Sequence, residues 1–473
     1  MRKSAMTLLM AVLMMCSLTA SGAKNAKYVF MFIGDGMGVN QVLATQMYLS
    51  ELEGRHDVTP LCFTQFPATG LVLTYSASSG VTDSSASGTA LSSGEKTANN
   101  AIGVLPDRKT PTKSIAERAH QQGKRVAICS SVGVDHATPG AYYAHRPSRN
   151  DYHQIGMQLA ESGFDFFAGG DFHQNFDKRN PDSDEGNMAY AEKNGYTIVR
   201  GMDEYRNAAA SSDKMILFEP EDDEISSLSF GIDQDENSLN IAKITTAAID
   251  FMMKEPKKGF FMMVEGGRID DSMHGQDAAT CVREVIDFDN AIKVAYDFYL
   301  KHKDETLIVV TADHETGGIV LGNNYSLNLK ALQYQKMSEG EFTKHIQKIN
   351  KDLGEDAPLT WEEMQEELKK NFGFWDAVKL SKDQESRLLN LYVEIFGMNY
   401  LDEDGKANTD VEKFSDLAVK IMNEAALVGV NLSSHSAGYV PVFAIGKGSE
   451  QFVGQINNID IPVKIANAAG IKW

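Results

Sequence analysis

The chain has 473 residues, of which 42% are hydrophobic and 23% charged, and its formal net charge at pH 7 is −20. This length suits one large α/β domain with insertions, or two domains. The acidic excess argues against a nucleic-acid partner, because phosphate backbones are bound by basic surfaces. Four cysteines, one of them inside the apolar N-terminal segment, exclude a disulfide scaffold.

Residues 1–23 have the pattern of a secretory signal peptide. Arg2 and Lys3 precede an apolar core over 6–15, and Ser21-Gly22-Ala23 offers small residues for cleavage. The apolar core is too short to span a membrane, and no later stretch is long enough. We therefore expect no membrane span and a periplasmic or secreted protein.

Strand-like and helix-like patterns alternate through most of the chain. Strands are predicted at 27–33, 70–75, 125–130, 259–264, 306–311 and 440–445, and helices at 40–52, 113–122, 151–162, 238–254 and 278–300. The alternation predicts an α/β fold, a three-layer sandwich around a mainly parallel central sheet. Residues 176–235 are polar and acidic, and they predict an excursion of loops with one or two short strands.

A charged, helical segment at about 325–428 interrupts this pattern. Capping boxes are predicted at Thr360/Glu363, Ser381/Gln384 and Thr409/Glu412, and helix stops at Gly397 and Gly429. Since a strand follows at 440–445, we interpret residues 24–473 as a single domain with a helical insert near the C-terminal third.

Several carboxylates and imidazoles directly follow predicted strands, and others lie close to them in the chain. In an open α/β sheet, residues beyond the carboxyl ends of separate strands meet in one crevice. Carboxylate and imidazole ligands without thiolates suit zinc or a harder divalent ion, and seven ligands are too many for one ion. The candidates are Asp35, Glu265, Asp270, His274, Asp313, His314 and His435.

Small residues at 81–91 lead from a loop into a predicted helix start that contains Ser84. A serine there lies among free amide donors at the positive end of the helix dipole. Its hydroxyl still needs a base or a metal ion to become a nucleophile. The Gly-x-Ser-x-Gly pattern of serine hydrolases is absent around Ser84, so the neighbouring ligands are the better source of activation.

Residues 135–139 and 146–149 add His136, Thr138 and Arg149. An arginine side chain matches two oxygens of a phosphate group. Taken singly, each residue has an ordinary interpretation: Arg149 as a solvated side chain, Thr138 as the residue before a turn, and His136 as a structural histidine. The combination of ligands, nucleophile and phosphate clamp favours a functional site.

These motifs resemble those of the alkaline phosphatase family. The similar segments are 32–38, 82–87, 264–274, 311–318 and the residues around His435, in that order along the chain. The resemblance implies a metal-dependent phosphomonoesterase that forms a phosphoserine intermediate, with broad specificity, activity favoured at alkaline pH and a homodimeric assembly.

Carried over residue by residue, the resemblance implies two zinc ions and one magnesium ion. Asp270, His274 and His435 would hold the first zinc, and Asp35, Asp313 and His314 the second, with Ser84 as its exchangeable ligand. Asp35, Thr138 and Glu265 would hold magnesium, and Asp83 would orient Arg149.

Two positions depart from the best-known bacterial pattern of the family. His136 stands where some members have aspartate, which suits zinc as the third ion, since imidazole prefers zinc to magnesium. Asp271 stands where the family often has lysine or histidine facing the phosphate, and we expect its carboxylate to weaken phosphate binding.

Alternative functions are a phosphodiesterase or a sulfatase of the same superfamily, or a non-enzymatic secreted binder of phosphate or metal ions. Ala86 and Gly88 occupy the places of proline and arginine in the sulfatase pattern, which argues against a sulfatase. Superfamily phosphodiesterases often use threonine where this chain has Ser84. A complete nucleophile and clamp beside full ligand sets argue against a passive binder.

Overall fold

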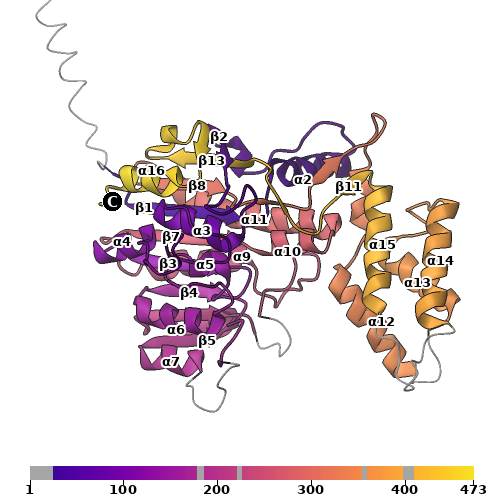
Figure 1. Cartoon of the computed structure of the whole chain (residues 1–473), viewed down its shortest axis with the longest axis horizontal. Helices are drawn as coiled ribbons and strands as arrows, with labels where there is room; N and C mark the ends of the chain where they lie inside the picture. The colour runs from indigo at the N-terminus through magenta and orange to yellow at the C-terminus, as the bar shows by residue number, and fades with distance from the viewer. Residues whose placement is uncertain (1–24, 178–185, 221–225, 354–358, 398–409) are drawn as a thin grey trace, which may run out of the picture.

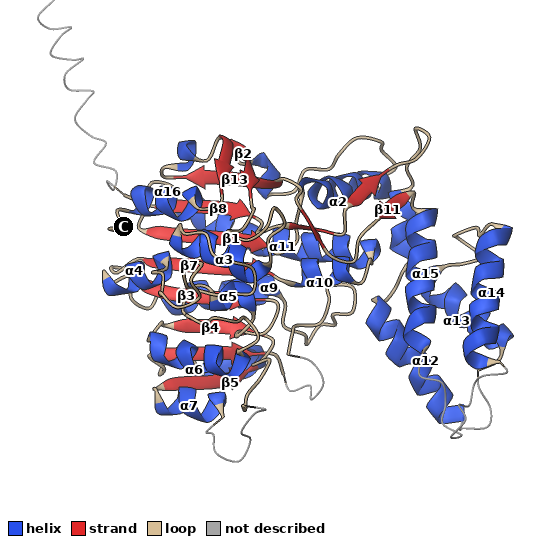
Figure 2. Cartoon of the chain, in the orientation of Figure 1, coloured by secondary structure: helices blue, strands red, loops and turns tan. Residues whose placement is uncertain are grey.

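The computed structural model describes residues 25–177, 186–220, 226–353, 359–397 and 410–473. Within these residues ten strands form one sheet in the order β14-β2-β13-β8-β1-β7-β3-β4-β6-β5 (Figure 2). The strands are β1 (Tyr28–Gly34), β2 (Ala68–Leu73), β3 (Arg125–Ser130), β4 (Phe166–Gly169), β5 (Tyr196–Arg200), β6 (Lys214–Phe218), β7 (Phe260–Gly266), β8 (Thr306–Thr311), β13 (Val440–Gly446) and β14 (Gly454–Asn457). β13 runs antiparallel to its neighbours β2 and β8, and the other neighbouring pairs are parallel.

Helices cover both faces of this sheet, which confirms the predicted α/β fold class (Figure 1). One face carries α3 (Ser84–Ser93), α4 (Ile115–Gln121), α6 (Tyr152–Ser162), α7 (Asn187–Lys193) and α16 (Asp460–Ala469). The other carries α2 (Val39–Leu52), α8 (Gly201–Ala208), α9 (Ile241–Met252) and α11 (Ala278–Lys301). This placement follows from right-handed crossovers between parallel strands.

The predicted strands and helices of the sheet region are present, with ends shifted by a few residues. Residues 176–235 are more regular than the predicted excursion: α7 precedes β5, α8 connects β5 to β6, and the two strands extend the main sheet to its edge. β5 and β6 agree with the one or two short strands predicted there; each has five residues with one charged residue at an end. β4, four residues long, was not predicted.

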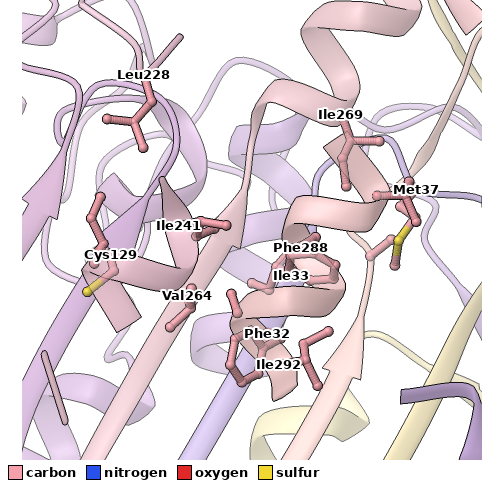
Figure 3. Packing of buried hydrophobic residues seen from close by; sticks show 14 of the residues in the cluster. Phe32, Ile33, Met37, Cys129, Leu228, Ile241, Val264, Ile269, Phe288 and Ile292 are labelled. Atoms are coloured by element: carbon pink, nitrogen blue, oxygen red, sulfur yellow. The ribbon is translucent and has the colours of Figure 1, made fainter. Parts of the chain in front are cut away.

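The centre of the sheet is apolar on both faces. Every residue of β1, β3, β7 and β8 is buried, as expected for parallel strands covered by helices on both sides. Phe32 of β1 packs edge-on against Phe288 of α11, with ring centroids 5.9 Å apart, and Ile292 lies beside them (Figure 3). This core fixes the strand ends from which the candidate site is built.

A group of helices lies to one side of the sheet, beyond α10 (Arg268–His274) (Figure 1). It contains η2 (Leu329–Tyr334), α12 (Glu339–Leu353), α13 (Trp361–Phe372), α14 (Lys382–Phe396) and α15 (Val411–Ala425). The capping boxes at Thr360/Glu363 and Ser381/Gln384 are confirmed. Thr409 lies outside the described residues, and Asp410 is the N-cap of α15.

Gly397 follows α14 as predicted, whereas the predicted stop at Gly429 is wrong. α15 ends at Ala425, and Gly429 lies within β11 (Val428–Val430), which pairs with β10 (Ile319–Leu321). Leu427 makes the turn instead, with a left-handed φ of 57°. A non-glycine residue rarely takes this conformation, so the sequence offered no sign of it.

The N-terminal signal predicted at 1–23 lies outside the described residues. In the part of the chain that the structure describes, no helix combines the length and apolar character needed to cross a membrane. Cys62, Cys129 and Cys281 are free thiols.

Candidate metal centre

Three neighbouring strand ends place acidic side chains and an imidazole at one rim of the sheet. β1 ends at Gly34, directly before Asp35, and β8 ends two residues before Asp313. Glu265 lies in β7, opposite Ile33 of β1 in the parallel register. Asp35, Glu265, Asp313 and His314 are all fully buried.

Asp35, Asp313 and His314, here called the buried group, have ligand atoms within 4.8 Å of one another. His314 Nε2 lies 3.3 Å from Asp35 Oδ1 and 3.2 Å from Asp313 Oδ2. The backbone amides of Gly36 and His314 donate to Asp313 Oδ1 at 3.2 and 2.9 Å. One oxygen of Asp313 is thereby fixed by the backbone, and the other faces the group.

Asp270, His274 and His435, here called the exposed group, form a second set within the same 4.8 Å limit. Asp270 and His274 share one face of α10, and His435 begins β12 (His435–Ser436), which pairs with β9 (Glu315–Thr316). His274 Nε2 lies 3.1 Å from Asp270 Oδ2.

The imidazole tautomers of the exposed group are set by backbone carbonyls. His274 Nδ1 donates to Ser433 O at 2.8 Å, and His435 Nδ1 donates to Thr82 O at 2.9 Å. Both Nε2 atoms are then free to act as ligands, and they lie 3.3 Å apart. Two lone pairs at this distance repel each other unless a proton or a metal ion lies between them, so the geometry fits a cation.

A third set combines Asp35 with His136 and Glu265. Thr138 Oγ1 donates to Asp35 Oδ2 at 3.3 Å, and Ser130 Oγ donates to Glu265 Oε2. Asp35 therefore belongs to two groups at once, which joins the third set to the buried group.

Burial makes this centre electrostatically strained without cations. It raises the pKa of Asp35 and of Asp313 well above the usual range, with a further rise from neighbouring carboxylates, and it raises the pKa of Glu265 to about 7. Asp35 Oδ1, Asp313 Oδ2 and Glu265 Oε1 are buried and accept no hydrogen bond from the described residues. Buried anionic oxygens need a counter-charge, and divalent cations fit these donor sets.

Ser84 contacts the buried group from the N-terminus of α3. Asp83 caps this helix, with its Oδ1 accepting from Ala86 N at 3.0 Å. Ser84 is the first helical residue, is 1% exposed, and its Oγ lies 3.2 Å from His314 Nε2. The serine and a candidate metal ligand, 230 positions apart in the sequence, are thus in direct contact.

Arg149 is held by two side chains. Its Nη1 lies 3.5 Å from Asp83 Oδ2, and its Nη2 donates to His136 Nε2 at 3.1 Å. Burial, followed by the charge of Arg149, lowers the pKa of His136 to about 3. The imidazole is therefore neutral and can accept this hydrogen bond. His136 therefore belongs to the third set and also contacts the guanidinium of Arg149.

Two neighbours of the centre were missed by sequence reasoning. Arg268 Nη1 donates to Asp271 Oδ2 at 2.8 Å, so the carboxylate of Asp271 has a positively charged partner. Thr316 Oγ1 donates to Asp270 Oδ1 and lies 3.2 Å from His314 Nδ1, bridging the exposed and buried groups. The spacing of three residues on a helix could have indicated the first contact. No local pattern indicates the second, which spans 46 positions.

Comparison with known sequences gives one consistent result. The sequence model of the family described as alkaline phosphatase matches residues 26–471. Alkaline phosphatase 4 of Bacillus subtilis is 32% identical over 444 residues, covering 91% of this chain and 86% of the relative. Alkaline phosphatase 3 of the same organism is 30% identical over 450 residues, covering 93% and 88%.

Solved structures show the same similarity. A cold-active alkaline phosphatase from a psychrophilic Shewanella superposes with a TM-score of 0.76 at 26% identity, covering 93% of this chain and 99% of that one. The alkaline phosphatase of the Antarctic bacterium TAB5 gives 0.66 at 26% identity, covering 95% and 100%. A variant of that enzyme with histidine changed to glutamate, which has Mg bound in its M3 site, gives 0.65 at 26%, covering 95% and 99%.

Proposed function

The chain belongs to the alkaline phosphatase family and is a phosphatase, and on this premise we propose that it hydrolyses phosphate monoesters through a phosphoserine at Ser84. The observation that carries the proposal is the contact between Ser84 Oγ and His314 Nε2 at the N-terminus of α3. It joins a candidate nucleophile of the motif to a set of candidate metal ligands.

The family is metal-dependent, and the donor sets support three ions. We assign one zinc to Asp270, His274 and His435, and one to Asp35, Asp313 and His314. The donors of the third set are compatible with Mg²⁺ and with Zn²⁺. His136 Nε2 accepts from Arg149, and its Nδ1 is buried without a hydrogen-bond partner among the described residues. The set therefore offers oxygens of Asp35, Thr138 and Glu265, which suit magnesium, and one imidazole, which suits zinc. The TAB5 variant with bound Mg has glutamate in place of a histidine, so it does not decide between the two ions for this chain, which keeps His136 in the third set.

Such ions lower the proton affinity of oxygen ligands and offset negative charge on phosphate and leaving-group oxygens. The protein itself orients the reactants. Ser84 Oγ attacks phosphorus and the alcohol leaves; water then attacks the phosphoserine and phosphate leaves. Two in-line displacements give net retention at phosphorus.

Arg149 and the first amides of α3 bind the other phosphate oxygens, where charge is spread in the transition state. Asp83 and His136 hold the guanidinium in place before substrate arrives, so its orientation costs little at the moment of reaction. These contacts recognise only the phosphate. His274 is 41% exposed, so we expect the leaving group to lie near solvent, which supports broad specificity.

Two sequence-based hypotheses belong to the same proposal. We expect export of the protein by the signal at 1–23, to the periplasm or the exterior, and a homodimer in solution. N-terminal sequencing of the exported chain and sedimentation of the purified protein test these two points.

The decisive experiment compares p-nitrophenyl phosphate, bis-p-nitrophenyl phosphate and p-nitrophenyl sulfate as substrates with zinc and magnesium present. We expect the monoester to be preferred, and Ser84→Ala to lower its turnover by about 1,000-fold or more. Ser93→Ala, a buried serine at the other end of α3, is the matched control and retains activity. Preference for the diester or the sulfate would overturn the substrate assignment.

A further inference from the structure

A carboxylate at the edge of the candidate site distinguishes this chain from the pattern it resembles. Asp271 follows the candidate ligand Asp270 on α10, and its side chain is 38% exposed. It interacts electrostatically with Glu265, His274 and Tyr152, and Tyr152 in turn contacts Arg149. The charge of Asp271 therefore acts on the same part of the centre in which Arg149 would bind phosphate.

Arg268 lies one helical turn before Asp271 and is fixed from three directions. Its Nη1 donates to Asp271 Oδ2 at 2.8 Å. Its guanidinium carbon lies 3.4 Å from the ring centroid of Phe230, and its backbone amide donates to Ser131 Oγ at 3.0 Å. The side chain is only 13% exposed. A pair of this kind is held in one geometry and is screened less than a pair of freely solvated side chains.

The charge balance matters because of what the site would bind. A phosphate monoester and inorganic phosphate are both close to dianionic above neutral pH. A carboxylate without a partner at the edge of the site would repel them, whereas a paired carboxylate exerts a smaller field. Arg268 is the residue that supplies the partner charge to Asp271.

We propose that Arg268 is a positioning residue that neutralises Asp271 and thereby sets how tightly the site holds phosphate dianions, substrate and product alike. This inference rests on the proposed function, because it needs phosphate to bind between Ser84 and Arg149. It also revises the expectation from sequence that Asp271 simply weakens phosphate binding. Only the part of the Asp271 charge that Arg268 does not compensate would weaken it.

A structural interpretation of the same contacts predicts something different. Arg268 also joins α10 to the loop containing Phe230, and α10 carries two ligands of the exposed group. If this connection were its role, removing Arg268 would lower stability, metal content and kcat. Removing Asp271 in addition would not restore them.

A double-substitution cycle separates the two. Wild type, Arg268→Met, Asp271→Asn and the double variant are loaded with zinc and magnesium, and KM for p-nitrophenyl phosphate and the inhibition constant Ki for inorganic phosphate are measured. Methionine keeps an unbranched apolar chain against Phe230. We expect Arg268→Met to raise both constants about fivefold at low salt, the scale of one charge near a protein surface.

Rescue is the outcome specific to neutralisation. The double variant returns KM and Ki to within about twofold of wild type, and 1 M NaCl shrinks the effect of Arg268→Met, since the screening length falls to ~3 Å. Asp271→Asn alone, a change at a partly exposed side chain, lowers Ki below the wild-type value. That single variant keeps the test valid if Arg268→Met folds poorly.

Lys344→Met is the matched control. Lys344 forms an ion pair of 2.9 Å with Glu341, also three residues apart, on α12. The substitution changes the net charge equally but far from the centre, and KM and Ki stay at the wild-type values.

Two results would overturn the inference: unchanged KM and Ki in both single variants, or raised values that Asp271→Asn fails to rescue while the unfolding temperature falls. A wild-type enzyme without monoester turnover would contradict the proposed function instead. In that case calorimetric binding of inorganic phosphate to the four metal-loaded proteins still tests the pair.

Discussion

The buried group and the exposed group of candidate metal ligands differ most in their access to solvent. In the buried group the side chains of Asp35, Asp313 and His314 are at most 1% exposed. In the exposed group Asp270, His274 and His435 are 9%, 41% and 15% exposed. The buried group stands directly on strand ends of the sheet, whereas the exposed group is assembled from a seven-residue helix and a two-residue strand.

This difference matches the two halves of the proposed reaction. Ser84 contacts the buried group, where water is excluded and electrostatic interactions are strong. The exposed group lies on the solvent side, where in the proposed reaction water would enter and the alcohol would leave. The buried group would act when phosphate is attached to Ser84, and the exposed group would act when phosphate is released.

The largest expected effect comes from removing one histidine from each group. His314→Ala should lower kcat/KM by about 1,000-fold or more, because several kcal/mol of stabilisation by a metal ion is lost. His274→Ala should cost roughly tenfold less, since water can take the vacated place of an exposed ligand. Steady-state kinetics with p-nitrophenyl phosphate provides the measurement.

His56→Ala, at an exposed histidine in the loop after α2, serves as the control and keeps wild-type kinetics. Equal losses for His314→Ala and His274→Ala would show that solvent access does not separate the two groups.

A smaller effect is expected from the residue that links the groups. Thr316→Val removes the hydroxyl that donates to Asp270 and lies near His314, and it should lower kcat/KM about tenfold, as usual for partners that orient metal ligands. Thr246→Val, at an exposed threonine of α9, is the control. Wild-type activity of Thr316→Val would mean that the groups are oriented independently.

Chelation should also distinguish the groups. Because ligands of the exposed group can be reached from solvent, we expect EDTA to remove its ion first and the ion of the buried group more slowly. Zinc release followed with a chromogenic chelator, in parallel with activity, should show two phases and loss of activity in the first. Release of both ions in a single phase would contradict the prediction that solvent access separates the two groups.

The smallest effect concerns the stability of the metal-free protein. Burial, with the neighbouring carboxylates, raises the pKa of Asp35 and Asp313, and burial raises that of Glu265 to about 7. A carboxyl group with a raised pKa keeps its proton longer in the folded state, so its contribution to stability is lost as pH rises towards the folded pKa. A hydrogen bond with Asp270 raises the pKa of His274 to about 9, and deprotonation there acts in the same direction.

The metal-free protein should therefore unfold about 2 to 5 °C lower at pH 9 than at pH 6.5. The metal-loaded protein should show little of this change, because the ions hold the ligands ionised. Calorimetry at both pH values checks this, and a metal-free protein that is more stable at pH 9 would contradict the electrostatic description of the buried group.

The sequence predicted the buried group more directly than its surroundings. Asp35 and Asp313 follow long apolar runs, and such runs identify buried parallel strands whose ends must meet. The pairing of His435 with Asp270 required the family pattern, because a two-residue strand has no periodicity. The contacts of Thr316 and Arg268 depend on side-chain geometry, and the four-residue strand β4 is too short to show a periodic pattern.

The most direct test of the central claim is covalent phosphate on Ser84 after rapid mixing with p-nitrophenyl phosphate and an acid quench, measured by mass spectrometry. This leaving group departs with little assistance, so attachment depends mainly on the buried group. The account predicts that phosphoserine accumulates in His274→Ala, where release is slowed, and does not form in His314→Ala. Phosphate on another residue, or equal labelling of both variants, would contradict it.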